Sequence, residues 1–485
     1  MELEKRSIKA HVMVLSYPAT GHTNPMLQFS KNIASRGLLV TFVTFSYNHH
    51  KVIQAKDSLR RLNLPIQFEC IPDGLPQDHT LDSNVNNVVF NHMRNNMDGS
   101  TLERLIHRLN TRGNAPPVCC IVYNPFLPWA RQVAKKMNIP HALFWTQSTA
   151  LFSIYYHFNN SSGEKWDSRQ MAESVSVSIP SLPELKLGDL PSAFTDTEER
   201  LQIYLHQLDG LSDVSWVLAN TFYELEAQTI DLMRSRFGVP FSSIGPCIPS
   251  AFLDGRNPHD ARVGADPWTA TDKVQEWLDR KPPSSVVYIS FGSITVINPQ
   301  QIHELALGIE SSQQNFLWVI RPPPGHDDIT EFFPAGFVEK TEGRGLVVSW
   351  CVQLEVLSHR SVAAFMSHCG WNSTLEALSL GVPVLTLGVW TDQTTNSKFL
   401  ADVWKAGVRM RKGEDGTVGR DEIERCMRMA VDKRSKAGEE HQKNAVKWKQ
   451  LAKSAMNEGG SFDTNLNEFV EDVVSIATRS FPPPS

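Results

Sequence analysis

The chain has 485 residues, of which 41% are hydrophobic and 20% charged, and its formal net charge is −5. This length predicts two or three domains, and the composition is typical of a globular protein. The negative charge argues against nucleic acid or an anionic membrane as a partner. No apolar run approaches the roughly 18 residues that a membrane-spanning helix requires.

Strands and helices alternate in the first half of the chain. Short apolar runs predict strands at 10–16, 39–45, 118–123 and 142–145. A helix is expected from Pro25, with Asn24 as its cap, because proline suits the first helical position. A second helix is expected over 128–137. Such βα alternation indicates a parallel sheet.

The second half repeats this pattern, with strands predicted at 285–291, 316–321, 345–349, 362–366, 382–387 and 407–410. Residues 246–272 are rich in Pro, Gly, Asp and Ala and have no clear period, so they are predicted to form a linker. The expected architecture is α/β: two Rossmann-like domains, 1–245 and 273–462, facing a cleft. A last helix within 463–480 is expected to return to the first domain.

The seven cysteines show no CxxC spacing, and Cys119 and Cys120 lie in an apolar run, which predicts buried thiols in a reducing compartment. The first apolar run is shorter than a signal sequence. No metalloprotease, P-loop or dinucleotide motif is present. We therefore expect a cytoplasmic monomer that uses no metal or redox cofactor.

Residues 350–393 carry the most informative pattern. At their centre an apolar strand runs into His-Cys-Gly-Trp-Asn-Ser, and a helix follows. Unpaired N–H groups at a helix start attract phosphate, and Gly370 permits close approach. Trp350 can stack on a base, Glu376 can accept ribose hydroxyls, and Asp392 can bind sugar hydroxyls.

This stretch resembles the signature box of the plant family-1 UDP-glycosyltransferases, and the likeness covers nearly the whole chain. It implies a GT-B fold and a UDP-sugar donor, with Gln393 resembling the glucose-using members. One departure is Gly388-Val389, where the family usually has Pro-Gln. The resemblance implies a donor site formed by Thr146, Ser293, Trp350, Val352, Gln353, His368, Gly370, Trp371, Asn372, Ser373, Glu376, Trp390, Asp392 and Gln393.

His22 is the predicted general base. Its place before a helix favours the neutral imidazole, and the family's base occupies the matching position. Asn124 stands where the family usually has an Asp that orients this histidine. An amide is expected to accept a hydrogen bond from the ring N–H, but it cannot offset the charge of an imidazolium. We therefore expect acceptors that ionise easily, unless Asn124 is neutral drift and another carboxylate supplies the charge.

The acceptor is expected in the first domain, near 84–97, Phe126, Thr149 and Pro191. The predicted reaction is inverting transfer of glucose from UDP-glucose to a small lipophilic metabolite, through a phenolic or flavonoid hydroxyl or a carboxylate. One alternative is C-glucosylation of a flavonoid or phloroglucinol-type ring. Another, of a different class, is a catalytically weak UDP-sugar-binding protein.

Overall fold

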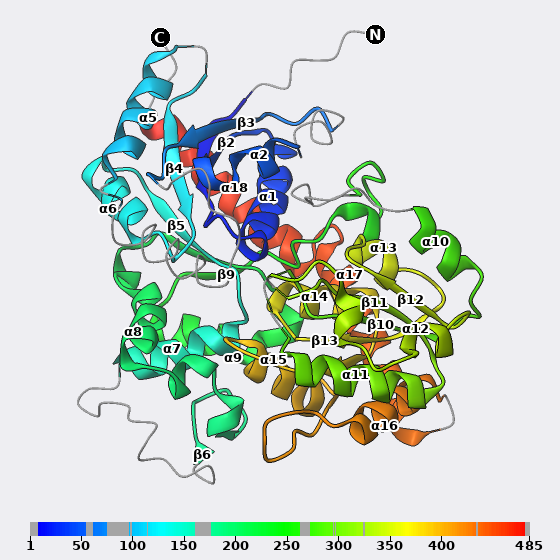
Figure 1. Cartoon of the computed structure of the whole chain (residues 1–485). Helices are drawn as coiled ribbons and strands as arrows, with labels where there is room; N and C mark the ends of the chain where they lie inside the picture. The colour runs from blue at the N-terminus through cyan, green and yellow to red at the C-terminus, as the bar shows by residue number, and fades with distance from the viewer. Residues whose placement is uncertain are drawn as a thin grey trace.

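The computed structural model describes residues 8–54, 62–74, 97, 99–113, 115–160, 176–261, 272–293, 295, 297–323, 325–432 and 435–480. Within these ranges two parallel sheets, each flanked by helices, form two Rossmann-like halves (Figure 1). The predicted α/β class is therefore confirmed.

The N-terminal sheet has the strand order β3-β2-β1-β4-β5-β8-β9 in the described part of the chain. Every residue of its central strands β1 and β4 is buried, as their apolar sequences require. The strands are β1 (Ala10–Leu15), β2 (Leu38–Phe45), β3 (Ile66–Ile71), β4 (Val118–Tyr123), β5 (His141–Trp145), β8 (Trp216–Ala219) and β9 (Phe241–Ser243).

The C-terminal sheet has the order β12-β11-β10-β13-β14-β15, and its strand pairs are parallel. The strands are β10 (Val286–Ser290), β11 (Asn315–Val319), β12 (Gly345–Val348), β13 (Val362–Ser367), β14 (Val384–Thr386) and β15 (Gly407–Arg409). Every strand predicted from the sequence is present, whereas the half-buried β3 and the short β8 and β9 were not predicted.

Helices fill the connections between the strands (Figure 1). In the first half they are α1 (Thr20–Ala34), α2 (Ser46–Gln54), α5 (Ser100–Thr111), α6 (Pro128–Lys136), α7 (Thr149–Asn160), α8 (Glu198–Leu205) and α9 (Tyr223–Phe237). A two-stranded hairpin, β6 (Ser176–Val177) with β7 (Leu185–Lys186), leads into the short 3-10 helices η2 (Leu187–Asp189) and η3 (Ser192–Thr195). In the second half the helices are α10 (Asp272–Asp279), α11 (Pro299–Ser312), α12 (Phe337–Lys340), α13 (Gln353–Leu357), α14 (Trp371–Leu380), α15 (Gln393–Lys398), α16 (Arg420–Val431), α17 (Lys436–Met456) and α18 (Ser461–Ser480).

The last helix, α18, packs on the N-terminal sheet, where it contacts β1, β4 and β9 (red in Figure 1). Asp463 in its first turn pairs with Arg36 at 2.7 Å, and Asp472 accepts a hydrogen bond from the Trp216 indole at 3.1 Å. Asp260 lies in the segment that connects the last strand of the first sheet to the first strand of the second, and it forms a buried ion pair with Lys31 of α1 at 2.9 Å. These contacts tie the end of the chain and the connecting segment to the first half.

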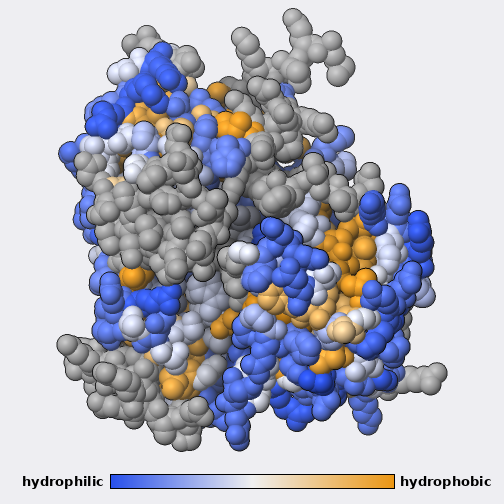
Figure 2. All heavy atoms as spheres, in the orientation of Figure 1, coloured by the Kyte–Doolittle hydropathy of each residue, from blue (hydrophilic) through white to orange (hydrophobic). Residues whose placement is uncertain are grey.

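Most of the C-terminal half visible in Figure 2 is hydrophilic, with a group of apolar residues between α10 and α13. None of the helices in the described ranges combines the length and apolar composition that a membrane crossing needs.

Cys119 and Cys120 are buried free thiols, as predicted.

The predicted start of the first helix is wrong. Helix α1 begins at Thr20 rather than Pro25, and the Ala19 carbonyl accepts the first helical hydrogen bonds, from His22 N at 2.9 Å and Thr23 N at 2.8 Å. Proline inside a helix removes the hydrogen bond to the carbonyl four residues earlier, here that of Gly21. The side-chain amide of Asn372, from the C-terminal half, donates to the Gly21 carbonyl in place of the missing backbone N–H.

Candidate active site

His22 lies in the first turn of α1, close to the carboxyl ends of β1, β4 and β5. Its ring lies against two aromatic side chains, with centroids 5.4 Å from both Tyr17 and Phe126 in edge-on geometry. Burial lowers the pKa of His22 to about 4, so the imidazole is neutral at pH 7. Tyr17 was not singled out from the sequence, although it follows the end of the first strand, where a parallel sheet places its ligands.

Two polar groups contact the same ring nitrogen of His22. Nδ2 of Asn124 lies 2.9 Å from Nδ1, and the hydroxyl of Thr146 lies 3.0 Å from it. Nε2 is therefore the ring nitrogen left for a bound molecule. Asn124 follows β4 and Thr146 follows β5, so the parallel sheet brings both to one edge, as the sequence predicted.

The expected direction of the hydrogen bond between Asn124 and His22 is wrong. The amide oxygen of Asn124 accepts from the backbone N–H of Phe126 at 3.1 Å, which turns the amide NH₂ group toward the imidazole. An NH₂ group can only donate, so Nδ1 accepts and the ring proton lies on Nε2. Rotating the fully buried amide would set two donors against each other at Phe126.

The central motif of residues 350–393 forms the turn from β13 into α14. Cys369 adopts a positive φ of 65°, and Gly370 is the N-cap of the helix. The imidazole of His368 fits between two glycines, since a Cβ at Gly292 or Gly370 would lie 2.7 or 2.6 Å from its Nε2. Burial lowers the pKa of His368 to about 4, and its buried Nδ1 has no hydrogen-bond partner among the described residues. The neutral imidazole of His368 thus lies beside the N-terminal turn of α14, where backbone N–H groups lack helical partners and attract phosphate.

The first turn of α14 also meets the N-terminal half directly. Nδ2 of Asn372 donates to the carbonyl of Gly21 at 2.9 Å. This is the carbonyl that Pro25 leaves without a helical N–H. The Trp371 indole donates a hydrogen bond to the carbonyl of Asn220 at 2.7 Å. Trp371 was predicted to bind the UDP-sugar, but its side chain joins the two halves of the chain.

Gln353 connects Glu376, the predicted ribose-binding residue, to Ser373 at the start of α14. Its Nε2 donates to Glu376 at 2.6 Å and to Ser373 Oγ at 2.9 Å, while its oxygen accepts from Tyr288 at 3.1 Å. Trp350 and Val352, at the end of β12 and the N-cap of α13, are partly exposed. The structure therefore brings the Glu376 carboxylate and the Ser373 hydroxyl together around Gln353. The partly exposed Trp350 lies three positions before Gln353 in the chain.

The end of the signature stretch folds around a buried carboxylate. Asp392 Oδ1 accepts from the Thr391 hydroxyl at 2.9 Å, and Oδ2 accepts from Asn396 at 2.7 Å. Burial raises the pKa of Asp392. The amide oxygen of Gln393 accepts from the backbone N–H groups of Val389 and Trp390, both at 3.1 Å, which leaves its NH₂ group for a ligand.

The other predicted site residues are less closely tied to this group. Ser293 is exposed after β10, and its carbonyl accepts from Arg321 at 2.6 Å. Trp390 donates to Thr295 at 3.3 Å. Thr149, the first residue of α7, and Pro191 are buried, and residues 84–96 lie outside the described part of the chain.

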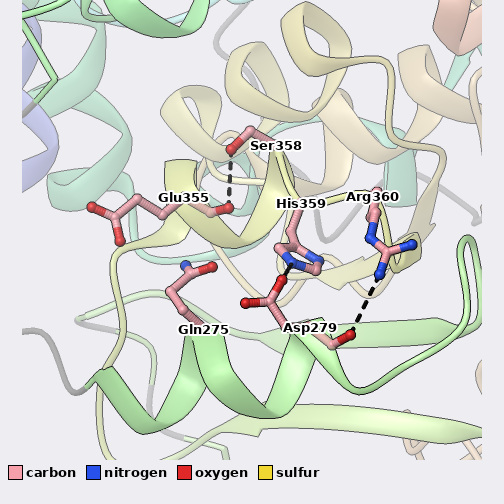
Figure 3. Close-up of a pocket in the computed structure, with 6 residues that line it drawn as sticks. All are labelled: Gln275, Asp279, Glu355, Ser358, His359 and Arg360. Carbon is pink, nitrogen blue, oxygen red and sulfur yellow. Dashed lines mark hydrogen bonds and ion pairs between the residues drawn. The ribbon is translucent and has the colours of Figure 1, made fainter.

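A shallow hollow of about 400 Å³ lies elsewhere on the C-terminal half, lined by Gln275, Asp279, Glu355, Ser358, His359 and Arg360 (Figure 3). The His359 ring meets the Asp279 carboxylate at 3.1 Å, and Arg360 points to the carbonyl of the same residue. These side chains join the end of α10 to the end of α13, and nothing about them indicates a ligand. Within the described ranges, no three His, Cys, Asp or Glu side chains gather as a metal site would require.

Comparisons with known proteins match this geometry. Residues 224–435 match the model of the family described as UDP-glucoronosyl and UDP-glucosyl transferase. UDP-glycosyltransferase 75C1 of Solanum lycopersicum is 40% identical over 480 residues, which cover 96% of this chain and 99% of that protein. Mogroside I-E synthase of Siraitia grosvenorii is 40% identical over 475 residues, covering 95% and 97%.

Solved structures agree with the sequence matches. Os79 from O. sativa in complex with UDP superposes with a TM-score of 0.80 at 32% identity, covering 95% of this chain and all of that one. The same rice protein has been solved with UDP and deoxynivalenol-3-glucoside. The fold and site thus define a GT-B glycosyltransferase that takes a UDP-sugar as donor and a small molecule as acceptor. The chain belongs to the plant family-1 UDP-glycosyltransferases.

Proposed function

We propose that the enzyme transfers glucose from UDP-glucose, with inversion, to a phenolic hydroxyl or a carboxylate of a small lipophilic metabolite. The observation that carries this proposal is the hydrogen bond from Asn372 to Gly21. It brings the phosphate-attracting start of α14 next to His22, so donor and acceptor chemistry meet at one point.

On the donor side, the N–H groups of α14 with His368 and Ser373 hold the diphosphate. Trp350 stacks on uracil, and Glu376, oriented by Gln353, accepts the ribose hydroxyls. Asp392 and the free NH₂ group of Gln393 bind the glucose hydroxyls. Residues 273–462 form the donor domain in this proposal, with 246–272 as linker.

On the acceptor side, residues 1–245 with helix 463–480 form the acceptor domain. Phe126, Thr149 and Pro191 contribute to its pocket, with Thr146 close to the sugar. The relatives support a small-molecule acceptor, since one is named mogroside I-E synthase and Os79 binds a trichothecene.

His22 acts in one of two ways, depending on the acceptor. A hydroxyl needs a base, which requires the ring proton on Nδ1, where Thr146 Oγ1 at 3.0 Å can accept it. A carboxylate is already ionised at pH 7 and needs no base, so the Nε2–H form that Asn124 favours can donate to it. The orientation of Asn124 therefore supports carboxylates over neutral alcohols. It also suits the C-glucosylation alternative, whose nucleophile is the carbon of an ionised phenolic ring.

We further propose a monomer that acts in the cytoplasm, where its seven free thiols stay reduced. Size-exclusion chromatography with light scattering checks the first point, and imaging of a fluorescent fusion checks the second.

The reaction is tested by incubating the enzyme with UDP-glucose and a panel of aromatic acids, phenols, flavonoids and phloroketones. Mass spectrometry identifies the product, which is then treated with base and afterwards with acid. Base-labile glucose indicates an ester, glucose released only by acid indicates an O-glucoside, and glucose resistant to both indicates C-glucosylation.

The variant His22→Ala serves as a control for the assigned base. It is expected to lose transfer to hydroxyl acceptors while keeping its affinity for UDP, as measured by calorimetry. Unchanged hydroxyl transfer would remove His22 from the mechanism. Tight UDP binding by the unmodified protein without any product would favour the UDP-sugar-binding alternative.

A further inference from the structure

Thr391 has an unusual backbone conformation beside the sugar-binding carboxylate. Its φ is 53°, in the left-handed region that β-branched residues rarely adopt. Thr391 directly precedes Asp392, and its hydroxyl donates to Asp392 Oδ1 at 2.9 Å. Asn396 holds the other carboxylate oxygen, Oδ2, at 2.7 Å, so the position of Oδ1 is the part of the Asp392 side chain that Thr391 determines.

A residue of the opposite domain holds Thr391 in this conformation. The backbone N–H of Thr391 donates to Ser192 Oγ at 2.7 Å, and the backbone N–H of Ser192 donates to the carbonyl of Thr391 at 3.0 Å. The two hydrogen bonds fix both main-chain polar groups of Thr391. They reach across 199 positions of sequence, from η3 to the loop before α15.

Neighbouring contacts keep Ser192 in place. The hydroxyls of Thr394 and Thr395 donate to the carbonyls of Leu190 and Asp189, each at 2.7 Å. The buried Asp189 carboxylate is also paired with Arg409. The segment before η3 is therefore docked on the donor domain, and Ser192 is the member of it that contacts Thr391.

We propose that Ser192 is a positioning residue for the donor sugar. It holds Thr391 in the left-handed conformation and so directs Asp392 toward the glucose of UDP-glucose. The inference rests on the proposed role of Asp392 in binding the sugar. Since Ser192 belongs to the acceptor domain, the sugar pocket is complete only when the two domains are docked. The contact with UDP itself does not depend on Ser192.

The test compares the affinities of UDP and UDP-glucose in the variant Ser192→Ala, measured by calorimetry without acceptor. We expect the Kd of UDP to stay within about twofold, and that of UDP-glucose to rise about three- to tenfold, as the loss of one hydrogen bond implies. The KM of UDP-glucose should rise with it, while the KM of the acceptor stays unchanged. Ser192→Thr keeps the hydroxyl and is expected to restore the affinity for UDP-glucose.

Two comparison variants separate the possible failures. Thr394→Val removes a hydrogen bond of the same docked segment but leaves Thr391 held, so it should retain the affinity for UDP-glucose. Equal losses in Thr394→Val and Ser192→Ala, or equal effects on UDP and UDP-glucose, would overturn the assignment of Ser192. If Asp392→Asn leaves UDP-glucose binding unchanged, the proposed role of Asp392 is wrong. If Asp392→Asn weakens binding and Ser192→Ala does not, only the inference about Ser192 fails.

Discussion

The substitution Asn124→Asp is predicted to change which acceptors the enzyme can use. A carboxylate at this position keeps the hydrogen bond from the Phe126 N–H, because it has only acceptor oxygens. The second carboxylate oxygen then takes the place of the amide NH₂, whose nitrogen lies 2.9 Å from Nδ1 of His22 in the unmodified enzyme. The ring proton is drawn to Nδ1, and Nε2 becomes free to remove a proton from a hydroxyl.

The size of the effect follows from the electrostatics of the pair. His22 starts from a pKa of about 4, which burial alone imposes. An opposite charge at hydrogen-bond distance raises such a pKa by about 1–3 units. Each unit stabilises the imidazolium by about 1.4 kcal/mol. Since the transition state carries only part of that charge, we expect kcat/KM for a hydroxyl acceptor to rise about ten- to hundredfold.

The same substitution should not help a carboxylate acceptor. No proton has to be removed from such an acceptor, and the negative charge that the new side chain adds would repel it, so its kcat/KM should stay the same or fall. The assay compares an aromatic carboxylic acid with the alcohol that carries the same ring, in both proteins at pH 7. ¹⁵N NMR of labelled histidine reports which ring nitrogen of His22 bears the proton.

Two results would refute this reasoning. One is a change in kcat/KM by the same factor for the acid and the alcohol. The other is an NMR spectrum of the unmodified enzyme that shows the proton on Nδ1. Either result would mean that Asn124 does not select the acceptor through the ring proton of His22.

Two further predictions concern His368 and its surroundings. Gly370→Ala places a methyl group 2.6 Å from His368 Nε2, so it should weaken UDP binding at least about tenfold, as a lost contact of about 1.4 kcal/mol implies. Gly419→Ala, whose nearest atom is 4.0 Å away, should leave the Kd unchanged; equal effects of the two variants would contradict the steric argument. Burial holds the pKa values of His22 and His368 at about 4, below the value of about 6.5 in the unfolded chain, so the unfolded chain binds more protons between these pH values. The free energy of unfolding should therefore fall as the pH drops from about 6.5 toward 4, by up to roughly 3 kcal/mol per histidine. Urea titrations at pH 7.5 and 5 measure this loss, and His368→Gln should make it smaller; the same loss in that variant would exclude His368 as a source.

The sequence was sufficient to predict most of the features that depend on local pattern. The apolar runs of β4 and β13 are continuous and fully buried, so their strands were identified with almost the correct ends. Asn124 and Thr146 follow neighbouring parallel strands, which is why both could be expected at the carboxyl edge of the first sheet, and Asn124 beside His22. The helix after the His-Cys-Gly-Trp-Asn-Ser motif was also expected, although it begins at Trp371.

Features that depend on a specific hydrogen bond could not be predicted in this way. The direction of the Asn124 amide is set by one backbone N–H, that of Phe126, and no periodicity reports it. The docking of Ser192 on Thr391 joins residues 199 positions apart, and neither residue type is unusual in a loop. Such contacts decide which atoms donate and which accept, so they bear on the chemistry more than on the fold.

Pro25 shows how a local rule failed where the two halves of the chain contact each other. Proline usually marks the start of a helix, because inside a helix it leaves a carbonyl four residues earlier without its N–H. Here that carbonyl belongs to Gly21, beside His22, and Asn372 of the C-terminal half donates to it at 2.9 Å. The proline thus leaves a hydrogen-bond acceptor in the first turn of α1, the Gly21 carbonyl, to which the opposite half of the chain can donate. Pro25 therefore lies next to the point at which the two halves of the chain meet around the proposed catalytic residue, His22.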